Sequence, residues 1–416
     1  MQLYPQPHFR YYGSPQNYLE IAKGVLAGHL KKEEQLLAAL EKRLGDWTGA
    51  RHSLCLPQGR LGIYLALRCL IQPGQRVILS PYTIFDVVNM VICAGGHPVF
   101  ADIEPDTCNI DPRQVKELID SDTGAVIATH LQGLACDIEE ISEICRARGV
   151  PLIEDGAQCL GGRVGGRHVG TIGDVGIFSF SLKKNVNTLY GGFLITNNNA
   201  LRDRIRADLD SFPFEGKGVI LKQAAKCLVG DVLTSPPVFQ ILTFWLLRHA
   251  CLHHTQLINK LTRPEDRPQL ITELPEQYRT RMTPLQARLA LRQIESIEQD
   301  MQKRLIYARS YYEGLSGLQD IGLPPLREDG SHIYPAFPIQ SPNRQKLVKH
   351  IMRCCCDVRI QSFTNAADLP CFSAYARYCP NARRIADRVV LLPTYPRYGE
   401  AEVHRMITAI RSYSRA

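Results

Sequence analysis

Apolar residues follow two different periods along the first part of the chain. Between residues 17 and 47 they recur every three or four positions, with a break near Gly28, so we expect an N-terminal helical arm. From residue 60 to 154, helical periods alternate with short and almost wholly apolar runs, as expected for strands buried on both faces. The expected helices are 60–70, 84–94, 112–119 and 138–148, and the expected strands are 76–80, 97–102, 125–129 and 151–154. This alternation predicts an α/β fold with a mostly parallel sheet sandwiched by helices.

The second half of the chain departs from this alternation. A glycine-dense connection over 161–174 leads to expected strands at 175–180 and 192–196 and a helix at 200–209. A long helix over 284–315, a strand at 333–339 and helices at 344–353 and 400–413 then suggest a small α+β C-terminal region. We therefore expect three parts: an arm over 1–50, a large domain over 51–282 with an apolar insertion at about 212–280, and a linking helix with the small domain over 283–416.

Charge and cysteine usage narrow the function classes. The 49 Lys and Arg residues exceed the 41 Asp and Glu residues by eight among 416 residues, and they are dispersed, so we expect no nucleic-acid partner. The 14 cysteines form no pairs with zinc-like spacing, so no metal site is expected. Free thiols in a reducing cytoplasm are the favoured interpretation and disulfides the second, because the first residues lack the apolar core of a signal peptide.

The block LIEDGAQCLGG, residues 152–162, carries the most informative chemistry. Asp155 ends an expected parallel strand, where open α/β sheets hold their ligands. Lys184 follows 29 residues later. A lysine that binds pyridoxal phosphate covalently and a carboxylate that keeps its pyridine nitrogen protonated form such a pair. Gln158 is placed to reach the ring hydroxyl of that cofactor.

Other residues complete the candidate cofactor site. The hydroxyl of Ser179 suits the cofactor phosphate, and so do the backbone N–H groups at Gly59, where a helix begins. Phe85 follows a strand end and is placed to stack on the pyridine ring. His130 is at least as well explained by a structural role, and Glu154 should point away from Asp155. The glycine-dense connection lacks a dinucleotide-binding GxGxxG pattern.

Together these segments identify a resemblance to a known family. The stretches GRLGIYLAL, GGHPVFADIEPDTCNIDP, EDGAQ, GDVGIFSFSLKKN, GGFLITNN and RRIADRVVLLPTYP resemble, in order and spacing, the pyridoxal phosphate-dependent sugar aminotransferases of the DegT and StrS type. The resemblance implies the aspartate aminotransferase fold (fold type I), with a seven-stranded sheet in the large domain. It also implies that Lys184 is the covalent lysine, Asp155 the pyridinium partner, Gln158 the ring-hydroxyl partner, Ser179 a phosphate ligand and Phe85 the stacking ring.

The chain departs from the family pattern at two positions. Gly59-Arg60 replaces the usual Gly-Thr or Gly-Ser pair at the phosphate, so Arg60 would bind the phosphate through its guanidinium. Lys183 replaces a small residue and stays an alternative to Lys184 as the covalent lysine. Relatives that dehydrate sugars carry histidine in place of the lysine, and Lys184 argues against that branch.

The resemblance also implies a reaction and an assembly. We expect amino transfer from glutamate to a keto sugar, nucleotide-linked, in surface polysaccharide or secondary-metabolite biosynthesis. A homodimer with shared active sites is expected, in which Lys217 and Lys222 of a partner's 211–230 segment approach the phosphate. A keto substrate that is not a sugar or is lipid-linked, and a non-catalytic cofactor-binding protein, are the alternatives.

The apolar stretch 228–252 matches the family least. It carries only Asp231 and Arg248 as firm charges, and Pro236-Pro237 interrupts it, so its unbroken apolar part is too short to span a bilayer. Packing on its own domain or on a dimer mate is the favoured interpretation. Peripheral contact with the inner face of the membrane is less favoured, supported by the flanking residues Arg248, His249, His253, His254 and Lys260.

Overall fold

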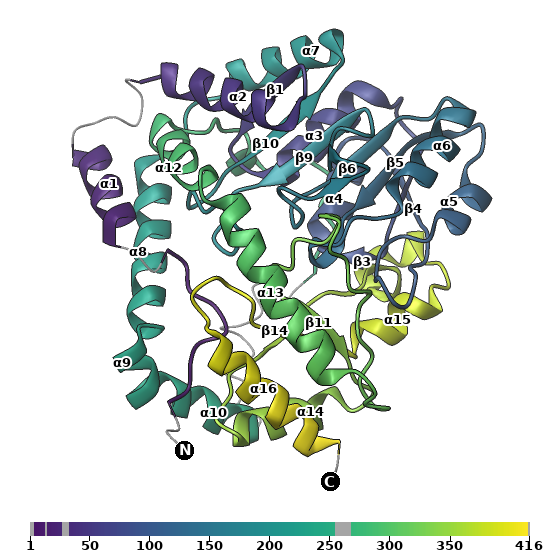
Figure 1. Ribbon diagram of the computed structural model, residues 1–416. Coiled ribbons are helices and arrows are strands. Elements are labelled where there is room, and N and C mark those ends of the chain that lie inside the picture. The colour runs from purple at the N-terminus through teal and green to yellow at the C-terminus, as the bar shows by residue number, and fades with distance from the viewer. Residues whose placement is uncertain (1–3, 13–14, 27–32, 254–267, 415–416) are drawn as a thin grey trace.

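A seven-stranded sheet forms the centre of the large domain (Figure 1). The computed structural model describes residues 4–12, 15–26, 33–253 and 268–414. The strand order is β1-β10-β9-β6-β5-β2-β4; β10 runs antiparallel to β9 and β1, and the other neighbours are parallel. The strands are β1 (His52–Leu56), β2 (Arg76–Leu79), β4 (His97–Phe100), β5 (Thr123–Thr129), β6 (Leu152–Asp155), β9 (Val175–Ser179) and β10 (Gly192–Thr196). This arrangement confirms the expected fold class, although the sequence pattern did not predict β1.

Helices cover both faces of the sheet because its strands are apolar on both faces. One face, with Ile127, Ile153 and Ile177, packs against α3 (Gly59–Leu70), α4 (Phe85–Cys93) and α7 (Asn199–Ser211). The other face carries Val126 and Leu152 beneath α5 (Pro112–Leu118) and α6 (Ile138–Arg148). On that second face Phe178 and Phe193 pack against α2 (Gln35–Thr48) and α12 (Pro284–Ile294). Strand alternation thus places neighbouring residues in separate cores.

The small C-terminal region contains a three-stranded antiparallel sheet. Its strands are β11 (Phe337–Gln340), β14 (Val389–Leu392) and β12 (Arg359–Ile360), and its helices include α13 (Ile297–Leu315), α14 (Arg344–Arg353) and α16 (Glu400–Tyr413). Helix α15 (Pro380–Ala386) instead packs into the core of the central sheet. The strand expected at 333–339 starts only at Phe337, because the left-handed backbone of Tyr334 (φ 46°) interrupts extended structure. The expected single helix over 284–315 is two helices, separated where the Ser296 amide bonds to the Gln293 carbonyl three residues back.

The apolar insertion folds as two helices with a bend between them. Helix α8 (Lys217–Leu233) leads through α9 (Pro236–Val238) and a π-helical turn (Phe239–Thr243) into α10 (Phe244–His253). One side of α8 packs near α1 (Pro15–Leu26), while Phe239 and Phe244 enter the core of the small region. The expected packing on its own chain is therefore confirmed for these faces.

Candidate active site

Asp155 lies at the carboxyl edge of the central sheet. The side chain is 5% exposed and accepts hydrogen bonds from the Ala157 N–H (3.1 Å) and the Thr129 hydroxyl (3.5 Å). Burial raises the pKa of the Asp155 carboxyl, and the Ala157 N–H and the positive charge of Lys184 oppose that rise. The fold therefore brings Asp155 and Lys184 into electrostatic contact across the loop that follows β9.

The neighbouring Lys183 has different surroundings. The Lys183 side chain reaches solvent, but the protein groups packed around it remove part of its hydration. This desolvation, together with the positive charges of Arg359 and Lys226, lowers the Lys183 pKa to about 8. Charge interactions thus couple Lys184 to Asp155 and Lys183 to two other cations. This contrast supports Lys184 as the covalent lysine.

Gly59 and Ser179 lie close together beside the loop over 180–191, which carries Lys184 and is called the lysine loop below. This close approach is called the Gly59–Ser179 cradle. A Cβ atom on Gly59 would lie 3.1 Å from the Phe178 carbonyl oxygen and 3.4 Å from the Ser179 Cβ, so the start of α3 approaches the end of β9 closely. Gln58, which caps α3, makes no side-chain bond to the first helical amides. The Ser179 hydroxyl lies 3.2 Å from that of Ser181. A helix N-terminus and two hydroxyls are suited to a phosphate group.

Arg60 has partners within the protein. Its guanidinium pairs with the Asp86 carboxylate and donates to the Tyr278 hydroxyl at 3.2 Å. Asp86 is buried in the first turn of α4, next to Phe85, whose ring is half-buried beside the core. The structure therefore links Arg60 to the helix that carries Phe85, and the predicted contact with a phosphate stays a prediction.

Gln158 lies beside the turn Leu131–Gly133, which follows β5. Its Oε1 accepts a hydrogen bond from the Gln132 N–H at 3.2 Å, and Gln132 adopts a left-handed backbone (φ 56°). This contact fixes the Gln158 side chain in the loop directly after β6. The Gln158 amide nitrogen can then act as a donor toward the ring hydroxyl predicted from the sequence.

Glu154 has a structural role on the opposite face. The two Glu154 oxygens accept bonds from the N–H groups of Gly170, Ile172 and Gly173 at 2.6–2.8 Å and face the His130 Nε2 at 3.1 Å. Burial alone would raise the Glu154 pKa, but His130 and these N–H groups lower it. His130 Nδ1 accepts from the Cys136 N–H, so both ring nitrogens are bonded, which confirms the structural interpretation. Glu154 thereby anchors the glycine-dense connection.

Helix α12 holds the lysine loop in place, and this was missed from the sequence. Gln293 accepts from the Asn187 N–H (3.0 Å) and donates to its carbonyl oxygen (2.8 Å), and Gln286 donates to the Tyr190 carbonyl (2.6 Å). More than a hundred residues separate Gln293 from Asn187, and no local motif indicates the contact.

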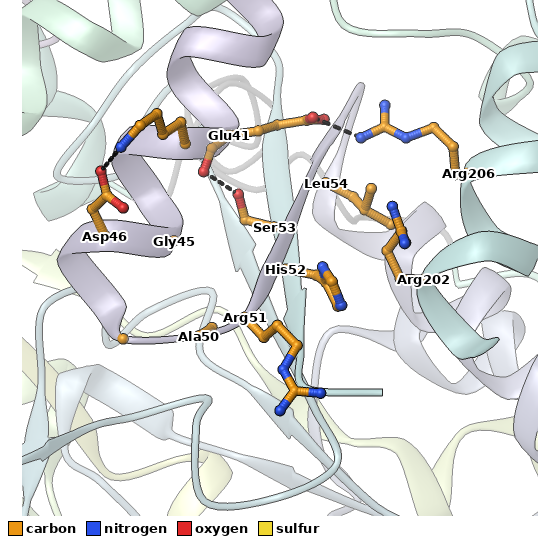
Figure 2. Close-up of a pocket in the computed structure, with 12 residues that line it drawn as sticks. Glu41, Gly45, Asp46, Ala50, Arg51, His52, Ser53, Leu54, Arg202 and Arg206 are labelled. Atoms are coloured by element: carbon orange, nitrogen blue, oxygen red, sulfur yellow. Dashed lines mark hydrogen bonds and ion pairs between the residues drawn. The ribbon is translucent and has the colours of Figure 1, made fainter. Parts of the chain in front are cut away.

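An open depression of about 500 Å³ lies elsewhere, between α2, β1 and α7. Figure 2 shows an ion pair between α2 and α7, Glu41 with Arg206 (2.6 Å), and a second pair along α2, Lys42 with Asp46 (2.6 Å). His52 lies at the start of β1, whereas Gly59 follows the end of that strand. This depression is therefore separate from the candidate active site.

The fold and the site define a pyridoxal phosphate-dependent aminotransferase. Lysine, buried aspartate and phosphate cradle supply the groups that this cofactor needs. The chain belongs to the DegT/DnrJ/EryC1/StrS aminotransferase family, whose sequence model matches residues 17–226 and 253–411.

Individual relatives agree with this assignment. The chain is 25% identical over 419 aligned residues to the spore coat polysaccharide biosynthesis protein SpsC of Bacillus subtilis, covering 97% of each chain. It is 32% identical over 193 residues to GDP-perosamine synthase of Vibrio cholerae, covering 46% of this chain and 52% of that one. The aminotransferase structure from Psychrobacter cryohalolentis shares the fold, with a TM-score of 0.76, 21% identity and 98% coverage of both chains.

Proposed function

We propose that this aminotransferase moves an amino group from glutamate to a keto sugar, carried as a nucleotide sugar, in the cytoplasm. The observation that best supports this proposal is the electrostatic interaction of Lys184 with buried Asp155, beside the Gly59–Ser179 cradle. The names of SpsC and GDP-perosamine synthase, which refer to polysaccharide biosynthesis and to an amino sugar, support the sugar substrate.

Each site residue then has a defined task. Pyridoxal phosphate, when bound, supplies an electron-accepting ring and a carbon that exchanges amino groups. Gly59 and Ser179 bind its phosphate, Phe85 and Gln158 orient its ring, and Asp155 holds a proton on the pyridine nitrogen. Lys184 Nζ takes a proton from the α-carbon of glutamate and, in the second half of the cycle, works in the reverse direction on the aminated sugar carbon.

We further propose a homodimer with shared active sites. Lys217 and Lys222 both lie exposed on α8, one near its start and one a turn later, and are available to a partner subunit's phosphate site. Two variants, Lys184→Ala and Lys217→Glu/Lys222→Glu, are mixed so that mixed dimers can form. Sedimentation measures whether dimers are present, and an activity assay of the mixture tests whether the sites are shared. Recovery of activity above that of either parent variant supports shared sites.

Product analysis tests the proposed reaction. Enzyme first treated with glutamate is separated from it and offered nucleotide-linked keto sugars, free keto sugars and lipid-linked keto substrates, and products are identified by mass spectrometry. We expect an amino sugar nucleotide together with one equivalent of 2-oxoglutarate from the first step. Amination of the lipid-linked substrates alone would replace the sugar nucleotide proposal, and no glutamate conversion would contradict an aminotransferase.

A further inference from the structure

Helices α8 and α10 expose an unusual amount of apolar surface. Among the described residues, 15 large apolar side chains are exposed, and ten of them lie between residues 217 and 253. Their exposure reaches 60% at Leu246 and 79% at Ile241. Exposed apolar side chains concentrated in one segment in this way indicate an interaction site rather than ordinary surface. The insertion face is defined as Leu228, Val229, Val232, Leu233, Ile241, Leu242, Trp245 and Leu246.

The insertion face lies outside the part of the chain that the family model matches. The family match stops at residue 226 and resumes at residue 253, so all eight members lie in the unmatched segment. None of the candidate active-site residues belongs to this segment. The features by which the family is recognised therefore do not account for this face.

The opposite sides of both helices are firmly anchored. Asp231, 6% exposed, accepts hydrogen bonds from the Tyr11 and Tyr12 N–H groups and the Tyr18 hydroxyl at 2.7–3.0 Å. On α10, Phe244 is fully buried while its neighbour Trp245 is 41% exposed. These helices are apolar on the side that packs on the protein and also on the side that faces outward. An outward apolar side indicates contact with a second apolar environment outside this chain.

The charges around the insertion face are of one sign. Lys226 is exposed on α8, and the Arg248 guanidinium lies 5.5 Å from the Trp245 ring centre on α10. Asp231 is the single acidic residue between 217 and 253, and it is bonded inward. Two copies meeting through this face about a two-fold axis would bring like charges together, whereas anionic headgroups would complement them.

The bend between the helices fits a surface position. No single described helix is long and apolar enough to cross a bilayer; only the pair 217–233 and 236–253 passes by length and composition, and it bends by 62°. The Trp245 indole N–H donates to the Gln240 carbonyl at 2.8 Å, so its polar edge is satisfied while the ring stays exposed. Aromatic rings of this kind favour the headgroup region.

We propose that the insertion face docks this enzyme onto the surface of a bilayer that contains anionic lipids. The eight apolar side chains enter the headgroup boundary, and Lys226 and Arg248 contact the anionic headgroups. This docking does not depend on which keto substrate the enzyme aminates. His254 and Lys260, which the sequence also placed beside the segment, lie outside the described residues.

Vesicle flotation of the full-length holoenzyme tests the docking. Vesicles are made of phosphatidylcholine alone or mixed with phosphatidylglycerol. The wild type should float with the mixed vesicles, and Ile241→Ser/Trp245→Ser/Leu246→Ser should partition at least about tenfold less, because burial of each removed apolar group is lost. The matched control Leu19→Ser/Ile306→Ser removes exposed apolar side chains elsewhere and should float like the wild type.

A charge variant provides an independent arm. Lys226→Glu should weaken the preference for phosphatidylglycerol, and added salt should weaken wild-type binding to the mixed vesicles. Wild type that stays unbound with both vesicle types overturns the proposal. A concentration-dependent oligomer that the triple serine variant lacks, without flotation of the wild type, would instead assign the face to a second copy. Glutamate conversion, measured on every variant, reports the proposed function separately.

Discussion

The cofactor site and the α8–α10 segment satisfy their side chains in different ways. Asp155 and Glu154 bond to polar groups of other segments, at Thr129, His130 and Gly170, and the apolar side chains of the sheet are buried. In α8–α10, one side is bonded and buried in the same manner, but the other side exposes leucine, valine and tryptophan. In the first region, these groups find their partners within the chain. In the second, the described chain leaves apolar side chains exposed.

This difference separates two uses of apolar sequence. In the sheet, apolar residues on both sides of a strand are explained by helices on both faces. In α8, the same composition is explained by protein on one side only. The exposed fraction of its apolar side chains, rather than its composition, therefore distinguishes a core helix from a docking helix.

The largest expected effect contrasts two adjacent lysines. Lys184→Ala should lower amino transfer from glutamate by at least about 10³-fold, because it removes both the covalent anchor and the group that moves the proton. Lys183→Ala should stay within about tenfold of the wild type. Stopped-flow absorbance of the glutamate half-reaction measures both. Equal losses in the two variants would break the distinction drawn between them.

A second contrast lies within α10. Phe244→Ala should cost about 3–5 kcal/mol of unfolding free energy, because it leaves a cavity in the small core. Trp245→Ala should change it by about 0.5 kcal/mol or less, as is usual for an exposed position. Urea denaturation followed by circular dichroism gives both values. A large loss for Trp245→Ala would mean that the insertion face is part of the core.

A third contrast lies within β6. Glu154→Gln should cost about 2 kcal/mol of stability at neutral pH, because bonds to a carboxylate are lost. Since the folded Glu154 pKa is lowered, its contribution exists above the ordinary glutamate pKa and disappears as pH falls through the folded pKa. Denaturation at neutral pH and at pH near 3 measures this; an unchanged deficit in acid would contradict it.

Asp155→Asn should leave the fold as stable as the wild type or more stable, in contrast to Glu154→Gln. Stability should hold or rise, because burial raises the Asp155 pKa and so disfavours the charged form in the fold. Turnover should fall about 10²-fold, since the amide does not hold the pyridine proton. A destabilised but active variant would reverse the roles of Asp155 and Glu154.

The smallest expected effect concerns the charge of Lys183. Its folded pKa of about 8 means that the fold prefers the neutral amine, so its stability contribution is complete above the unfolded pKa and lost as pH falls through 8. Lys183→Gln should therefore stabilise the protein at pH 7, by less than about 1 kcal/mol because the exposed side chain is screened, and have no effect near pH 11. Thermal melts at both values measure the difference.

Much of the fold and the class of cofactor were predictable from local patterns. Short apolar runs identified six of the seven central strands, and the spacing of Asp155, Gln158, Ser179 and Lys184 indicated the cofactor. Strand β1 was missed because its five residues occupy an edge with no preceding alternation. The division into three domains stays a prediction.

Contacts between distant segments were not predictable. Nothing local to Arg60 indicates that Asp86 and Tyr278 engage its guanidinium, or that Gln293 fixes the lysine loop at Asn187. In α10, periodicity did not separate buried Phe244 from exposed Trp245, since a π-helical turn precedes them and shifts the helical faces. Tertiary packing decides each of these outcomes.

Reduction of the holoenzyme with borohydride tests the central claim most directly. The treatment fixes the cofactor to the amine that holds it, and fragment-ion mass spectrometry of the peptide around residues 181–190 identifies that amine. We predict a single cofactor adduct on Lys184 in the wild type and in Lys183→Ala. An adduct on Lys183, or no adduct on either lysine in protein loaded with pyridoxal phosphate, would contradict the proposed site.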